Sequence, residues 1–363
     1  VIDPAIKADL DAVQKLGEGD CHVADRDLAD KDWLAACVSD HGPIRYYAYD
    51  RATKKGTFLF SHRKALESLT SALAPMKPVT IDARDGMKLH AFLTLPVGVA
   101  QKNLPAVLLV HGGPWANDAW GFDPWAQWLA NRGYAVLQVN YRGSTNYGKK
   151  YLHAGDRQWG LKMHDDLIDG VKWMVKKGYA DEKKVAIFGA SYGGYSALEG
   201  VTATPTTFAA AVDICGPSSI RTLFASIPPY WKPFMATFRK RVGNPDDPKD
   251  AELLKNASPL FKADKIVRPL LIGQGANDPR VKQAEAEQIV AAIEKNGGAV
   301  TYVLYSDEGH GFHRQENNLD FSARAEAFLG RYLGGRVEPM KGDRVEGSTA
   351  VVKVVTGKSA SAH

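Results

Sequence analysis

Short segments of this sequence place a serine, an acid and a histidine where acyl-transfer chemistry would need them. In "FGASYGGYSALEG" (188–200), Ser191 lies between Gly189 and Gly193. The pattern G-x-S-x-G is typical of a nucleophile elbow, a tight turn that exposes a serine between a strand and a helix. The apolar run "KVAIF" comes before this segment, and helix-forming residues follow it. We therefore predict that Ser191 is a nucleophile, with a purely structural bend as the alternative.

A serine hydroxyl becomes reactive only with a base that removes its proton and a carboxylate that orients the base. In the chain order typical of this elbow, both follow the serine, each in a loop after a later strand. Asp278 follows the apolar run "PLLIGQG", and His310 follows "TYVLYS", so they are the predicted acid and base. His313 competes as the base, with a surface position as its structural interpretation. Asp264 precedes its strand and Asp307 shares the loop of His310, so both are weaker candidates for the acid.

Attack on a carbonyl creates an oxyanion, which needs hydrogen-bond donors that already point at it. One predicted donor is the backbone N–H of Tyr192, the residue after the nucleophile. The other is predicted in the glycine-rich segment "VHGGP" (110–114), where Gly113 is preferred over Gly112. A plain turn before the proline is the alternative for this segment.

These residues require a sheet whose strands end at one edge. From residue 78 onward, a hairpin pattern that turns at Asp85–Gly86 is followed by apolar runs that alternate with helical patterns. Such runs are typical of parallel strands that helices bury on both faces. The main runs are "PAVLLVHGG", "YAVLQVNYRG", "KVAIFG", "FAAAVDICG", "RPLLIGQG" and "VTYVLYS". The predicted fold class is α/β, with a mostly parallel central sheet covered by helices on both faces.

The same patterns divide the chain into three parts. Residues 1–76 form an N-terminal segment, in which 1–29 show no strong periodicity and 32–60 indicate three strands of a meander. Residues 77–340 form the α/β domain. Residues 341–363 are mostly Gly, Lys, Ser, Thr and Val without a helical period, so we predict a mobile tail.

Composition narrows the classes of function. The net charge is +5, and Lys and Arg are scattered, which gives little support for nucleic-acid binding. No apolar stretch is long enough for a transmembrane helix, so no membrane partner is expected. Three cysteines without a Cys-x-x-Cys motif predict neither a disulfide framework nor a zinc site, and Cys215 is predicted to be a buried apolar residue. Without a His-Glu-x-x-His motif we expect no metal, and no other cofactor.

Two clusters of conspicuous residues have structural interpretations. Four tryptophans are predicted to serve core and loop packing rather than ligand binding: Trp115, Trp120, Trp125 and Trp128. Three acidic residues are predicted to form a solvated helix face: Asp165, Asp166 and Asp169.

Five motifs together carry a family resemblance. They are "HGGPW", "NYRGSTNYG", "GASYGGYSAL", "NDPRV" and "DEGHGF". In this order and spacing, over residues 78–337, they resemble the catalytic domain of the prolyl oligopeptidase family of serine peptidases. They are most similar to its bacterial acylaminoacyl-peptidase and dipeptidyl-peptidase-like members. The resemblance implies an α/β-hydrolase fold and a Ser-Asp-His triad that cleaves short peptides.

The resemblance also implies a substrate pocket. It assigns five residues to that pocket: Tyr192, Arg280, Val281, Tyr230 and Trp231. The side chain of Tyr192 would line the site for the residue before the scissile bond, and Arg280 would bind a substrate carbonyl through its several donors. A surface arginine paired with Glu285 is the alternative for Arg280. For Tyr230 and Trp231, in "IPPYWKPFMATF", the alternative is ordinary packing.

In that family a β-propeller accompanies the hydrolase and restricts access to it. Here only residues 1–76 come before the hydrolase pattern, and the three strands at 32–60 resemble the last propeller blade. We therefore expect the chain to be a fragment of a longer protein whose missing propeller portion is its partner.

The predicted function is that of a serine peptidase that acts on peptide substrates through an acyl-enzyme. The alternative with the same chemistry is a carboxylesterase. A non-catalytic α/β-hydrolase-like binding module is a third reading, but it would be expected to lack a member of the triad. The sequence leaves open whether the chain forms a homo-oligomer, and whether a soluble bacterial protein of this kind would lie in the cytoplasm or the periplasm.

Overall fold

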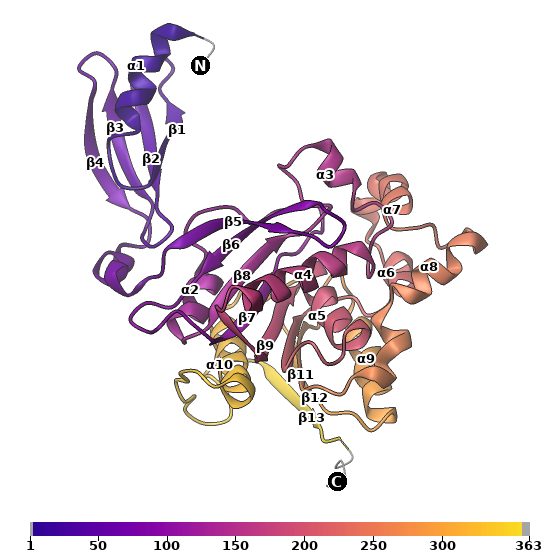
Figure 1. Ribbon diagram of the computed structural model, residues 1–363. Coiled ribbons are helices and arrows are strands. Elements are labelled where there is room, and N and C mark those ends of the chain that lie inside the picture. The colour runs from indigo at the N-terminus through magenta and orange to yellow at the C-terminus, as the bar shows by residue number, and fades with distance from the viewer. Residues whose placement is uncertain (1–2, 358–363) are drawn as a thin grey trace. The chain divides into compact units, whose positions relative to one another are not determined.

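The computed structural model describes residues 3–357, which fall into two compact units. The first contains residues up to 77 together with 94–99 and 119–131. The second contains 78–93, 100–118 and the chain from 132 onward. Figure 1 labels most of the helices and strands of both units.

A mixed sheet forms the centre of the fold. Within residues 3–357 it has nine strands, in the order β13-β12-β11-β10-β9-β7-β8-β6-β5. Their bounds are β5 Met76–Asp82, β6 Lys88–Thr94, β7 Leu104–Val110, β8 Ala135–Asn140, β9 Ala180–Ala190, β10 Ala210–Ile214, β11 Leu270–Gly275, β12 Val300–Tyr305 and β13 Ala350–Val355. The pairs β8–β7, β7–β9, β9–β10, β10–β11 and β11–β12 are parallel. Their carboxyl ends therefore meet at one edge of the sheet, where residues from separate loops can converge.

Helices fill the connections between these strands. Their bounds are α2 Pro124–Asn131, α3 Lys149–His153, α4 Lys162–Lys176, α5 Tyr192–Ala203, α6 Ile220–Ala225, α7 Met235–Arg241, α8 Ala251–Asn256, α9 Gln283–Lys295 and α10 Gln315–Leu333, with 3-10 turns η1 Lys64–Ala72, η2 Pro229–Phe234, η3 Pro248–Asp250 and η4 Pro259–Lys265. Gly200 of α5 faces Ile187 of β9, whereas Gly273 of β11 faces Phe321 of α10 across the opposite side of the sheet. Helices thus cover both faces, which confirms the predicted fold class.

The predicted hairpin also forms. β5 and β6 are joined by a turn in which Ala83 N–H donates to the carbonyl of Met87 (2.9 Å) and Gly86 N–H donates to that of Ala83 (2.8 Å). Gly86 has φ +85°, a conformation that glycine adopts without the strain of a Cβ.

A second sheet lies in the first unit. Its four antiparallel strands follow in sequence order: β1 Asp20–Arg26, β2 Asp32–Val38, β3 Arg45–Asp50 and β4 Lys55–Ser61. The last three are the predicted meander, whereas β1 and the preceding helix α1 (Pro4–Val13) lie where the sequence showed no periodicity. The Asp3 carboxylate caps α1 by accepting a hydrogen bond from Ala5 N–H (2.9 Å), and Val13 packs into the core of this sheet beside Trp33 and Tyr49.

Two predictions about this part of the molecule and the tail are wrong. Cys21 and Cys37 face each other on β1 and β2 and form a disulfide, which an odd number of cysteines had obscured. The predicted mobile tail contains β13, whose backbone pairs antiparallel with β12 from Ala350 opposite Tyr305 to Val355 opposite Val300. The last residues of that prediction, 358–363, lie outside the described part. Cys215 is buried, as predicted.

Within residues 3–357, no helix combines the length and the apolar character that a membrane crossing requires.

Candidate active site

Ser191 occupies a sharp turn between β9 and α5. It has φ +59° and ψ −118°, and its N–H donates to the carbonyl of Ile214 on β10 (2.8 Å). A Cβ on Gly193 would overlap the carbonyl oxygen of Val110, and one on Gly189 would overlap the backbone of Gly193. Both glycines are therefore sterically required, and the strained serine is held out at the carboxyl edge of the sheet.

Two loops bring an imidazole and a carboxylate to this serine. His310 follows β12, and its Nε2 lies 3.0 Å from Ser191 Oγ. His310 Nδ1 lies 2.7 Å from Oδ2 of Asp278, which follows β11. The other carboxylate oxygen of Asp278 accepts hydrogen bonds from the N–H groups of Arg280 (2.8 Å) and Val281 (2.9 Å). Because the Asp278 carboxylate is buried and has three hydrogen-bond partners, two backbone N–H groups of its own loop and the histidine, it can fix the orientation of the imidazole.

The competing residues lie elsewhere. His313 is exposed, and its N–H donates to the carboxylate of Glu308. Asp264 is exposed in η4. Asp307 binds Thr349 Oγ1, Asn317 and Arg314, and these hydrogen bonds, that of Thr349 first, lower its pKa to about 2. The structure thus brings together only Ser191, Asp278 and His310 among the predicted nucleophile, acids and bases.

The glycine-rich segment lies against the nucleophile. A Cβ built on Gly112 would stand 3.5 Å from Ser191 Cβ. The adjacent Gly113 is exposed and has φ +124°, so its backbone adopts a conformation reserved for glycine. Tyr192 is the first residue of α5, where a backbone N–H has no acceptor within the helix. The two predicted oxyanion donors therefore sit on segments that flank Ser191.

His111 is itself part of this segment, and its imidazole is neutral. Its Nδ1 is 2.8 Å from the carbonyl of Gly112, and its Nε2 is 3.0 Å from Ser144 Oγ. Burial lowers the pKa of the imidazole to about 4, because a charged ring would lose its hydration. His111 is thus a structural neighbour of the site and not a second base at neutral pH.

The predicted pocket residues fall into two groups. The ring of Tyr192 is buried, with its edge on Trp159 (centroids 4.6 Å apart), and Val281 is buried as well. Tyr230 is exposed. The ring of Trp231 stacks on that of Phe238, with centroids 5.6 Å apart, and the guanidinium of Arg280 lies over the Trp231 ring, 5.7 Å from its centroid. The alternative pairing of Arg280 does not form, since the buried Glu285 carboxylate accepts hydrogen bonds from Ser218 and Ser219 N–H.

Trp115 joins the aromatic group from the other side. It follows the glycine-rich segment, packs edge-on against Phe238 (4.9 Å), and lies under the guanidinium of Arg241 (5.1 Å). The prediction of packing for this tryptophan is confirmed, and the packing connects the glycine-rich segment to α7. Phe238 was not identified from the sequence, although it lies in the segment assigned to the pocket.

The prediction of a solvated acidic helix face is wrong. Asp166 is fully buried, and its carboxylate accepts hydrogen bonds from the backbone N–H and the guanidinium of Arg142. Asp169 binds Arg84, and only Asp165, which also binds Arg84, remains partly exposed. The error has a physical cause: Arg142 lies in a loop 24 positions earlier, so the helix sequence alone cannot reveal that this carboxylate has a partner.

One further thiol lies beside the triad. Among the described residues, Cys215 Sγ, a carboxylate oxygen of Asp278 and a ring nitrogen of His310 lie within 4.8 Å of one another. Burial raises the pKa of the Cys215 thiol, so it is present as a neutral group. At neutral pH this thiol is therefore not an ionised nucleophile beside Ser191.

Comparison with known proteins decides the family. The model of the prolyl oligopeptidase family matches residues 120–336, more than half of the chain. The chain belongs to the prolyl oligopeptidase family. Within this family it is similar to dipeptidyl aminopeptidase BIII of Pseudoxanthomonas mexicana, with 51% identity over 358 residues, 97% of this chain and 52% of the relative. It is also similar to dipeptidyl peptidase family member 6 of Caenorhabditis elegans, with 41% identity over 93% of this chain and 48% of the relative.

A solved structure agrees with this assignment. A puromycin-hydrolyzing peptidase of Mycobacterium tuberculosis superposes with a TM-score of 0.77 at 27% identity, over 86% of this chain and 48% of that one. The chain thus spans about half the length of the prolyl oligopeptidase family members that it matches.

Proposed function

We propose that this chain is the catalytic part of a serine peptidase that hydrolyses short peptides through an acyl-enzyme. The observation that carries the proposal is the position of His310, with one nitrogen 3.0 Å from Ser191 Oγ and the other 2.7 Å from Asp278. This arrangement supports proton transfer from a serine to an imidazole whose tautomer a buried carboxylate fixes.

The reaction follows from these contacts. Ser191 Oγ attacks the scissile carbonyl carbon while His310 Nε2 takes the hydroxyl proton. The N–H groups of Tyr192 and Gly113 bind the oxyanion, and Asp278 stabilises the imidazolium. The C–N bond then breaks as His310 returns the proton to the leaving amine. Water, deprotonated by the same imidazole, hydrolyses the ester at Ser191 and restores the serine.

The relatives favour peptides as substrates over simple esters. One is named a dipeptidyl aminopeptidase, another is named a member of the dipeptidyl peptidase family, and the solved neighbour is a puromycin-hydrolyzing peptidase. We accordingly propose release of dipeptides from the N-terminus of short peptides. Arg280, Tyr230 and Trp231 are proposed to contact the substrate, supported by the approach of Arg280 to the Trp231 ring. Tyr192 and Val281 are proposed to contact the substrate less directly. Their side chains are buried, so they would form the wall of the pocket beneath the substrate.

Two assays test this proposal. A fluorophosphonate probe should label the wild-type protein and fail to label Ser191→Ala; labelling of the variant would refute the assignment of the nucleophile. Dipeptidyl, aminoacyl and acetyl-aminoacyl chromogenic amides should then be compared with nitrophenyl esters. Cleavage of dipeptidyl amides supports the proposal, whereas turnover of esters alone would make the protein a carboxylesterase.

The first unit is proposed to pack against further propeller sheet of a longer protein. Strand β4 is the edge of its sheet and exposes Phe58, Leu59 and Phe60, each about half accessible. In complete proteins, an exposed apolar edge strand is normally covered by another element or chain.

The Cys21–Cys37 disulfide supports a location in an oxidising compartment such as the periplasm. Mass spectrometry of non-reduced peptides from the source cells would test the location, since free thiols there would contradict it.

A further inference from the structure

The glycine-rich segment is fastened to a neighbouring loop. We call residues 111–118 ("HGGPWAND") the oxyanion loop and residues 140–146 ("NYRGSTN") the support loop. Four hydrogen bonds reach the backbone of the oxyanion loop: Tyr141 OH to His111 O (3.0 Å), Thr145 N–H to Ala116 O (2.9 Å), Asp118 N–H to Asn140 Oδ1 (2.8 Å) and Asn140 Nδ2 to Asp118 O (3.1 Å). The support loop therefore holds the oxyanion loop at both of its ends.

Ring contacts strengthen this connection beside the nucleophile. Tyr141 stacks on His111 with centroids 4.4 Å apart and planes 14° apart. Its ring also lies 5.2 Å from that of Tyr192, the residue after Ser191. A displacement of Tyr141 would thus move both segments that carry the proposed oxyanion donors.

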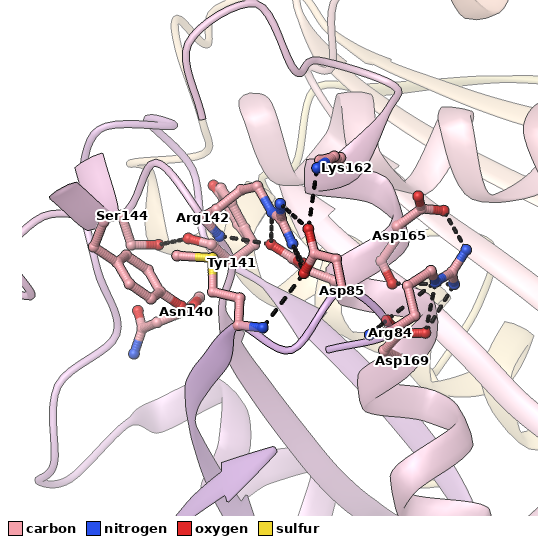
Figure 2. A network of polar contacts seen from close by, with 12 residues as sticks. Arg84, Asp85, Asn140, Tyr141, Arg142, Ser144, Lys162, Asp165 and Asp169 are labelled. Atoms are coloured by element: carbon pink, nitrogen blue, oxygen red, sulfur yellow. Dashed lines mark hydrogen bonds and ion pairs between the residues drawn. The ribbon is translucent and has the colours of Figure 1, made fainter. Parts of the chain in front are cut away.

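Arg142 anchors the support loop from behind. Its backbone N–H and Nε both donate to Asp166 Oδ2 at 2.8 Å, and Nη2 donates to Asp166 Oδ1 at 2.6 Å. Nη1 and Nη2 also bind the carboxylate of Asp85 at 2.8 and 3.0 Å (Figure 2). The side chain of Arg142 is 5% exposed, and its guanidinium is bound to helix α4 on one side and to the β5–β6 turn on the other.

Stability alone is a weak reason for such a cluster. Removing an arginine and a carboxylate from water costs several kcal/mol per ion, which roughly cancels their attraction. The planar, bidentate geometry instead fixes direction, because a guanidinium held by two carboxylates can adopt only one orientation. Asp85 accepts from Arg142 first and from Lys162 as well, and these partners lower its pKa, so it stays charged.

We propose that Arg142 is a positioning residue for the oxyanion site. Its hydrogen bonds to Asp166 and Asp85 fix the position of the support loop. Tyr141 and Asn140 of that loop in turn hold the oxyanion loop in place beside Ser191. This inference rests on the proposed function. It assigns to the arginine an effect on the transition state that a purely structural ion pair would not have.

The chain offers a matched control. Arg84 lies in the same β5–β6 turn as Asp85 and binds two carboxylates of the same helix, Asp165 and Asp169. Its hydrogen bonds connect the turn to α4 without passing through the support loop. Arg84→Met therefore removes a comparable connection between turn and helix, and leaves the anchor of residues 140–146 in place.

The experiment compares Arg142→Met, Arg142→Lys and Arg84→Met. Active sites are counted with a fluorophosphonate, and kcat and KM are measured on a dipeptidyl amide. Affinities are measured for a dipeptidyl boronic acid, which forms a charged tetrahedral adduct on the serine, and for the product dipeptide. Arg142→Met should lower kcat about 10- to 100-fold, since a displacement near 1 Å costs about that much.

The boronic acid should lose affinity by the same factor, while KM and product affinity change less than about twofold. Arg142→Lys should recover part of the loss, and Arg84→Met should stay near wild type. An unchanged boronate affinity, or an equal loss in Arg84→Met, would overturn the proposal. If Arg142→Met does not fold, Asp85→Asn replaces it, because this variant keeps the contacts of Arg142 with Asp166. Asp85→Asn should lower kcat and boronate affinity by a smaller common factor and leave KM nearly unchanged. Wild-type kcat and boronate affinity in Asp85→Asn would also overturn the proposal. Absence of labelling or turnover in the wild type would instead refute the proposed function.

Discussion

Replacing Asp278 by asparagine should change the tautomer of His310 while a side chain of nearly the same shape still fills the position of the acid. In the native protein, Oδ1 accepts from the N–H groups of Arg280 and Val281, and Oδ2 lies 2.7 Å from His310 Nδ1. An asparagine oxygen must take the place of Oδ1, because two backbone donors point at it. The amide NH₂ then faces His310 Nδ1, and that nitrogen must accept a hydrogen bond.

The consequence for catalysis follows from this reversal. A neutral imidazole that accepts at Nδ1 carries its proton on Nε2, so it cannot remove the proton of Ser191. The expected loss in kcat is about 10⁴-fold, or about 5 kcal/mol of transition-state stabilisation. KM should change little, because Asp278 is buried behind the histidine and away from substrate.

The assay is turnover of a dipeptidyl amide at neutral pH, with circular dichroism to verify folding. Asp307→Asn is the matched control, since Asp307 lies in the loop of His310 but binds Thr349 and Arg314. That variant should keep activity within a few-fold of wild type. A loss below tenfold in Asp278→Asn, or a comparable loss in Asp307→Asn, would refute the reasoning.

Two further predictions concern other titratable groups. His310→Ala should abolish turnover, while His313→Ala should retain it, because His313 is exposed and contacts Glu308 through its backbone; equal losses in kcat would contradict the assignment. Burial raises the pKa of Asp213 to about 7, and Gly216 N–H donates to one of its oxygens. The folded state therefore holds this proton more tightly than the unfolded state, so the contribution to stability is present below about pH 4 and is lost as the pH rises through 7. The free energy of unfolding, measured in urea between pH 4 and 8, should therefore decrease less with pH in Asp213→Asn than in the wild type. An equal decrease in both proteins would contradict the raised pKa of Asp213.

The arrangement of the candidate triad could be anticipated because each residue follows an apolar run. Parallel strands bring the ends of such runs to one edge, so Asp278 and His310 could be placed near Ser191 from the sequence alone. The burial of Asp166 could not be foreseen. Its partner Arg142 lies in a loop, and a pair formed by folding leaves no periodic signal in either segment.

Elements without a hydrophobic period were also missed. β1 has a mostly exposed pattern, and its place in the sheet depends on pairing with β2 and on the contact of Cys21 with Cys37. β13 is a run of valines around one lysine that exposes most of its side chains. Its position is determined by backbone hydrogen bonds to β12, which side-chain patterns do not report.

The pairing of β13 with β12 affects how far this chain can be shortened without exposing a new edge of the sheet. A fragment that stops at the sequence-based boundary near residue 341 would keep every residue of the candidate active site. It would nevertheless leave the backbone donors and acceptors of Val300–Tyr305 open along one side. An open strand of that kind recruits strands from other molecules. β13 is itself the edge strand of this sheet, and it carries Lys353 and mostly exposed side chains. A protein trimmed before it would have the inner strand β12 as its new edge, and it should precipitate or form oligomers while its chemistry remains intact.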